Sequence, residues 1–360
     1  MTGDSGPAPK KPRLEPRPWS GGLPSIEEAR RERDKHRWKT PPKFWAWTAL
    51  ILGASFIFWW KKDDGEIQTM RNELLARQRV VREKLGPRWF PLRDKIERWT
   101  GECAADGQEV VDQPALTGWD FRSKPGIYLR LGQGDAQGPD KIRAAATQSL
   151  RDGFTACLLR VANPNPLAGA SCKSNKDCPA KQQCNEFEHC AEPDQPYNLR
   201  LAYRTMWILT DEWIDDVQAI GKKLTMRGAV ASFDAWNTYD LPVAVDLLTK
   251  AEYLLVVVDE LAEGQAPAPA PAPSAELDAG AGVNPAISTS PHQARVCLWR
   301  LQDDRKVLRV RREAAGRLVG GSGTTDVESL DAQQRQANAC ALALAVRAAI
   351  GEDDAAILPE

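Results

Sequence analysis

The chain has 360 residues, 42% of them hydrophobic, and its 48 Lys and Arg nearly balance 49 Asp and Glu, which leaves a net charge of −1. This length allows one or two globular domains. The charge balance argues against a nucleic-acid-binding protein, because phosphate binding normally shows as a clear basic excess. The three histidines, His36, His189 and His292, leave little material for imidazole catalysis or a multi-histidine metal site.

The N-terminal part is polar and divides into two segments. Residues 1–24 are rich in Pro and Gly, which predicts a disordered cytoplasmic arm. Ser25-Ile26-Glu27-Glu28 fits a capping box, so residues 25–43 are expected to form a charged juxtamembrane helix that ends before Pro41 and Pro42.

Residues 44–60 read FWAWTALILGASFIFWW and contain no charge. As a helix with ~1.5 Å rise per residue, this run spans roughly 25 Å, close to a hydrocarbon core of ~30 Å. Trp45 and Trp47 at one end and Trp59 and Trp60 at the other match the aromatic belts of membrane interfaces. The run predicts a transmembrane helix acting as an uncleaved signal anchor, with a buried core helix as the alternative.

The flanking charges predict the orientation of this helix. Residues 24–43 carry seven Lys and Arg, against five in residues 61–80. The positive-inside rule therefore places the N-terminus in the cytoplasm and the bulk of the chain outside. We expect a single-pass protein of a cell inner membrane, whose partners are the lipid bilayer and other envelope proteins.

Beyond the apolar run, residues 61–100 form a predicted helical stalk. Ile67, Met70, Leu74 and Leu85 recur at helical spacing with charged residues between them. Basic residues interrupt a strict heptad, so packing onto the following domain is favoured over self-association.

The ectodomain comprises residues 101–260 and 292–352, interrupted by a Pro/Ala-rich linker at 262–291. Its hydrophobic patterns predict an α/β or α+β fold, a mixed sheet covered by helices. The expected strands are 126–131, 155–161, 199–209 (where a helix is also open), 253–258, and a hairpin of 295–301 and 306–311; the expected helices are 141–154, 211–224, 241–251 capped by Asp240, and 327–350.

A cysteine-rich insertion occupies residues 171–192. Cys172, Cys178, Cys184 and Cys190 are each separated by five residues in a polar stretch that has almost nothing apolar to bury. Only cross-links could hold such a segment in one shape. Two disulfides of open connectivity fit the extracytoplasmic location. Zinc bound with the help of His189 is the alternative, although structural zinc sites usually take ligands in pairs two to four residues apart, so no metal is expected.

The other four cysteines are scattered along the chain. Cys157 and Cys297 lie in apolar segments expected to form strands, and both are expected to be buried free thiols. A further bridge among Cys103, Cys157, Cys297 and Cys340 stays open.

Two resemblances follow from these motifs. The insertion resembles the short cysteine-rich repeats of the Dickkopf-N-terminal-like type, through Cys172, Ser174, Asp177, Cys178, Pro179 and Cys184. The ectodomain resembles the small envelope domain of curli-secretion lipoproteins, TolB amino-terminal domains and lipoprotein activators of peptidoglycan synthases, through Ala251 to Leu255 and the pair Val307 and Leu308. The lipobox cysteine of those lipoproteins is absent here.

Neither the glycine-rich segments nor the acidic residues predict a catalytic or cofactor site. Residues 132–138 and 320–325 lack the Gly-Lys-Ser/Thr of a P-loop and are expected as turns. Asp211, Glu212, Asp215 and Asp216 cluster at a predicted helix start, where the helix dipole favours them. The leading hypothesis is an envelope protein whose outer domain binds or scaffolds other proteins. The alternatives are an anchored enzyme acting on envelope polymer and a ligand sensor.

Overall fold

The computed structural model describes residues 42–149, 153–159, 169–179, 182–185, 188–192, 195–260, 291–317 and 327–352. The predicted cytoplasmic arm, nearly all of the juxtamembrane helix and nearly all of the Pro/Ala-rich linker lie outside these ranges. The chain forms two units, residues 1–63 and 64–360. Helix α2 (Pro42–Ala104) begins in the first unit and continues into the second.

The expected membrane segment, residues 44–60, is helical and forms part of α2. Trp45 and Trp47 expose 62% and 66% of their surface. The side chains of Trp59 and Trp60 lie outside the described part of the chain. Among the described residues, no helix combines the length and the apolar character needed to cross a membrane.

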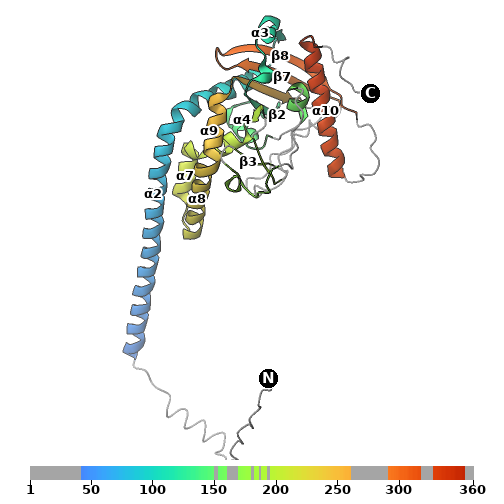
Figure 1. The fold of residues 1–360 in the computed structure, drawn as a ribbon. Coiled ribbons are helices and arrows are strands. Elements are labelled where there is room, and N and C mark those ends of the chain that lie inside the picture. The colour runs from blue at the N-terminus through green and yellow to red at the C-terminus, as the bar shows by residue number, and fades with distance from the viewer. Residues whose placement is uncertain are drawn as a thin grey trace, which may run out of the picture. The chain divides into compact units, whose positions relative to one another are not determined.

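The second unit is built on a six-stranded mixed sheet of order β1-β8-β7-β6-β2-β5 (Figure 1). Strand β2 pairs in parallel with β5 and β6, and the remaining neighbours are antiparallel. The strands are β1 (Val110–Val111), β2 (Gly126–Gly132), β5 (Tyr197–Asn198), β6 (Tyr253–Asp259), β7 (His292–Arg300) and β8 (Arg305–Ala314). The predicted mixed α/β architecture is therefore confirmed, as are the strands expected at 126–131 and 253–258 and the hairpin.

Helices cover both faces of the sheet. The sequence of β6 is continuously apolar because its side chains are buried on both of these faces. Leu254, Val256 and Val258 face one hydrophobic cluster, whereas Leu255 and Val257 face the other. All are buried, as expected for a central strand covered on both sides. The first face carries α2, α4 (Pro139–Ala146), α6 (Arg200–Met206), α7 (Asp211–Ala219), α8 (Lys223–Ala235) and α9 (Leu241–Lys250); the second carries α3 (Gln113–Gly118), α5 (Gly153–Leu159) and α10 (Val327–Ala349).

The expected stalk packs onto the domain instead of standing free. Ile67, Leu74 and Ile96 of α2 are buried in the first cluster. The indole of Trp99 stacks on that of Trp299 in β7, with ring centroids 5.6 Å apart and planes 5° apart. This part of α2 is thus a structural layer of the domain.

One expected strand was wrong, and at 199–209 the helical alternative holds. Residues 153–159, within the region expected as a helix to 154 and a strand from 155, form helix α5, which packs on α10. Residues 200–209 form α6 and a short 3-10 helix (Trp207–Leu209). Leu199, Ala202, Tyr203 and Met206 are buried at helical spacing, so the helical period outweighed the apparent alternation.

The helix boundaries also differ from expectation. The predicted helix 141–154 is shorter, ending at Ala146, and the helix expected over 211–224 ends at Ala219, before a separate α8 begins at Lys223. Helix α9 lies where predicted, but Asp240 makes no side-chain capping bond and instead accepts one from Asn175. A tertiary partner therefore replaced the expected local cap.

Candidate functional site

The cysteine-rich insertion is held by the two disulfides that the sequence predicted. Cys172 bonds to Cys184 and Cys178 to Cys190, so the first cysteine pairs with the third and the second with the fourth. A two-stranded ladder of β3 (Gln183–Cys184) and β4 (Cys190–Ala191) accompanies them. The zinc alternative fails because bridged sulfurs are no longer thiolate ligands.

Local hydrogen bonds complete this insertion. The Asp177 carboxylate accepts the backbone N–H groups of Lys173 and Ser174 at 2.9 and 3.0 Å, which holds the pKa of Asp177 below its ordinary value. The Asn175 amide donates to Asp240 of the domain. Burial raises the pKa of Asp240. The insertion is thus held in shape by its own disulfides and is joined to the domain by a hydrogen bond between Asn175 and Asp240.

The expectation that Cys157 and Cys297 are free thiols was wrong. Cys297 of β7 bonds to Cys103 at the end of α2, and Cys157 of α5 bonds to Cys340 of α10. Sequence separations of 194 and 183 residues give no local spacing signal. The first bridge fastens α2 to the sheet, and the second joins α5 to α10, which both lie on the other face.

A buried charged cluster lies at the carboxyl ends of the parallel strands β2 and β6. Arg130 donates two hydrogen bonds to Asp259, and Nε2 of His292 lies 3.0 Å from Asp259 Oδ1. Burial opposes ionisation of Asp259, but Arg130 and His292 more than offset it, so the pKa of Asp259 lies below its ordinary value.

The position of this cluster is where open α/β sheets usually bind ligands. However, the exposed fractions of Arg130, Asp259 and His292 are 3%, 0% and 3%. Their contacts join β2, β6 and β7 internally, so we assign the cluster to the stability of the sheet. His292 is the first residue of β7, which begins three residues before the strand expected from residue 295.

The acidic residues expected at a helix start do lie there. Asp211 and Glu212 occupy the first turn of α7, which Thr210 caps by accepting the Trp213 N–H at 3.3 Å. Asp211 also pairs with Arg82 of α2, which lowers the pKa of the carboxyl group. Asp215 and Asp216 are exposed. Capping and one ion pair account for this cluster without a catalytic role.

Residues 133–138 form the turn region between β2 and α4, as expected. Residues 320–325 lie outside the described ranges.

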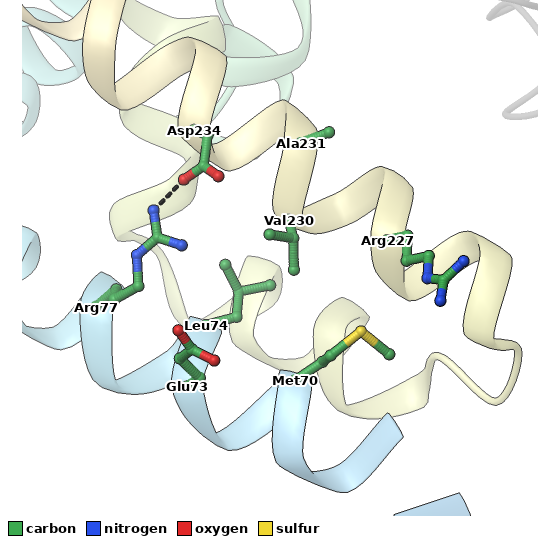
Figure 2. Close-up of a pocket in the computed structure, with 8 residues that line it drawn as sticks. All are labelled: Met70, Glu73, Leu74, Arg77, Arg227, Val230, Ala231 and Asp234. Carbon is green, nitrogen blue, oxygen red and sulfur yellow. Dashed lines mark hydrogen bonds and ion pairs between the residues drawn. The ribbon is translucent and has the colours of Figure 1, made fainter. Parts of the chain in front are cut away.

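A groove lies between α2 and α8 (Figure 2). Its volume is about 250 Å³, and apolar atoms form most of its surface. The apolar lining comes from Met70 and Leu74 on α2 and from Val230 and Ala231 on α8. Charged side chains surround this floor, namely Glu73, Arg77, Arg227 and Asp234.

One end of the groove is closed by an ion pair between Arg77 and Asp234 (Figure 2). The remaining space is smaller than the roughly 300–1,000 Å³ of pockets for cofactors and drug-sized ligands. It suits one or two aliphatic side chains of another chain.

A second, similar groove lies further along α2. Its volume is about 240 Å³, and it is lined by Leu85, Arg88, Trp89, Leu92, Met206, Val245, Leu248 and Thr249. On α2 both grooves use positions i, i+3, i+4 and i+7, beginning at Met70 and at Leu85. The apolar stripe of α2 is visible in the sequence, but neither groove is, because the other wall of each comes from helices distant in sequence.

Comparison of the chain with protein-family models, with curated proteins and with solved structures found no match.

Proposed function

We propose that this chain is a single-pass envelope membrane protein whose extracytoplasmic domain is a binding or scaffolding module for other proteins. The observation that supports the location is the use of all eight cysteines in four disulfides. Disulfides persist in oxidising compartments and are rare in the cytosol. A domain fastened by four of them belongs outside the cytoplasm.

The anchor in this proposal is the apolar start of α2. Trp45 and Trp47 and the following Leu50, Ile51 and Leu52 all expose more than half of their surface. Exposed apolar side chains beside interfacial tryptophans are suited to contact with lipid. The bilayer is therefore a proposed partner of this segment, and the domain begins on the same helix a few turns later.

The binding role rests on the groove between α2 and α8. Its apolar floor is open to solvent, and its size suits protein side chains better than a cofactor. By contrast, the buried carboxylates of Asp259 and Glu97 already pair with Arg130 and Arg143 inside the domain. The most accessible chemistry in the described residues is thus apolar contact with a charged rim, the usual composition of a protein interface.

The experiment is a matched pair of substitutions on α8 in the full chain. Ala231→Arg places a long charged side chain in the groove, whereas Thr225→Arg makes the same change at an exposed position that does not line it. After crosslinking in cells, Ala231→Arg should lose the proteins that co-purify with the unaltered chain, and Thr225→Arg should retain them. Equal recovery with both variants, at equal protein levels, would contradict the binding role of the groove.

A further inference from the structure

Two charged side chains at the rim of the α2–α8 groove have no polar partner among the described residues. Arg77 is paired with Asp234, but Glu73 and Arg227 form no hydrogen bond or ion pair with any described residue. They have opposite signs and lie on opposite walls, Glu73 on α2 and Arg227 on α8 (Figure 2). An occupant of the groove would therefore meet one unpaired negative charge and one unpaired positive charge.

An exposed apolar side chain lies on the same helix as Arg227. Leu224, in the first turn of α8, exposes 82% of its surface, more than any other large hydrophobic side chain described. Leu224, Arg227 and Ala231 follow one another at spacings of three and four residues, so they share one face of α8. The helix that forms one wall of the groove therefore also carries an exposed leucine side chain, one turn from the groove residue Arg227.

A surface that carries both an exposed leucine and a groove, with unpaired charges of both signs, can be complementary to itself. In a twofold interface residue i contacts residue j and j contacts i. A twofold axis that bisects the line from Glu73 to Arg227 brings each of them against the opposite charge of the other copy.

We propose that the occupant of the α2–α8 groove is a second copy of this chain, bound through two symmetric Glu73–Arg227 contacts with Leu224 at the edge of the contact. The inference rests on the proposed binding function and names its partner. A different protein would need a charge pair arranged by chance to match, whereas a second copy carries it by symmetry.

The test is charge reversal followed by mixing of full chains in detergent at low salt, where rim charges are least screened. In Glu73→Arg both symmetric contacts become Arg against Arg, and in Arg227→Glu both become Glu against Glu. Each variant alone should dimerise more weakly than the unaltered chain, by on the order of tenfold in Kd, because like charges in an interface oppose association. Mixed together, the two variants restore both opposite-charge contacts and should form a heterodimer with nearly the original Kd.

Differently tagged chains and sedimentation equilibrium would measure these constants. Glu83→Arg is the matched control, since it reverses an exposed charge on α2 that does not line the groove, and it should leave self-association unchanged. Unaltered self-association in both single variants, failure of the mixture to recover, or a monomeric unaltered chain would overturn the inference.

A photoreactive residue at position 224 separates this inference from the function on which it rests. A crosslink to a second copy supports the twofold contact. A crosslink to a different protein, lost in Ala231→Arg, overturns the second-copy inference and leaves the proposed binding function standing.

Discussion

The guanidinium of Arg130 donates two hydrogen bonds to the carboxylate of Asp259, from Nε to Oδ2 at 2.8 Å and from Nη2 to Oδ1 at 2.7 Å. The two residues belong to the neighbouring parallel strands β2 and β6, and their side chains are sealed from solvent. Bidentate pairs of arginine and carboxylate are among the stronger polar interactions in proteins. Removal of either residue would leave the charge of the other buried, without water to stabilise it.

Arg130→Met should therefore lower the free energy of unfolding by about 3–5 kcal/mol, because Asp259 would stay buried without its cation. The double variant Arg130→Met/Asp259→Leu should recover most of this loss, since apolar residues of similar volume can replace a buried pair. Denaturant unfolding of the full chain, followed by tryptophan fluorescence, measures both.

The control for this prediction is the exposed pair of Lys250 and Asp246 on α9. Lys250→Met should change the free energy of unfolding by less than about 1 kcal/mol. A loss in Arg130→Met no larger than in this control would show that the buried pair is not the source of the stability.

The pH dependence follows from the lowered pKa of Asp259. A carboxyl group with a depressed folded pKa contributes its full stability above its unfolded pKa, about 3.9, and loses it as the pH falls through the folded value. Within that acid range the unfolded state binds one more proton, so stability should fall by about 1.4 kcal/mol per pH unit from this group. Asp259→Asn should remove this component from the slope below about pH 4, and identical slopes for both proteins would refute the assignment.

The disulfides should differ in their effect on global stability. Cys103→Ser/Cys297→Ser opens a link between residues 194 apart in sequence and should cost about 2–5 kcal/mol in the free energy of unfolding. Cys172→Ser/Cys184→Ser opens a 12-residue link inside the insertion and should leave the unfolding of the sheet nearly unchanged, within about 1 kcal/mol. Under non-reducing conditions the intact chain should be about 8 Da lighter than the reduced chain, at about 1 Da per hydrogen lost; free thiols in the native protein would contradict the pairing.

Topology is predicted with residues 1–43 in the cytoplasm and 61–360 outside. Protease added to spheroplasts should digest the domain and leave an N-terminal tag protected. Deletion of residues 44–60 should release the chain from the membrane fraction. Full protection of the domain together with an accessible tag would reverse the proposed orientation.

Scaffold and enzyme predict different responses to substitution. Neutralising Asp211, Glu212, Asp215 and Asp216 together should leave any cellular phenotype largely intact, whereas Val257→Asn should prevent folding. Val257 is fully buried in β6, and an unpaired polar group there costs about 1–3 kcal/mol in addition to lost packing. Selective loss of function in the acidic variant, at normal protein levels, would favour the enzyme alternative.

Local signals in the sequence predicted the elements whose environment is uniform along the chain. The apolar run Tyr253 to Val258 reads as a central strand because it is buried on both faces. The hairpin of β7 and β8 was predicted from two apolar segments and the acidic turn between them. The helical period of α2 and the evenly spaced cysteines of the insertion are likewise local, and the structure has both as expected.

The elements that were wrong are short apolar segments whose period is ambiguous. Gly153–Leu159 became a helix because α10 packs on it and Cys340 bonds to Cys157. Neither partner is near in sequence. The helix α8 was missed for a related reason, since only Met226 and Phe233 of its residues are buried.

By itself, the sequence determined the mixed α/β class, the paired cysteines of the insertion and the apolar run at residues 44–60, since each depends on neighbours within a few residues. Only the tertiary structure decided that Cys103 meets Cys297, that His292 joins Asp259 and Arg130, and that α2 and α8 enclose a groove. These contacts join residues far apart in the chain. Their formation depends on how sheet and helices pack in space, for which periodicity and spacing carry no signal.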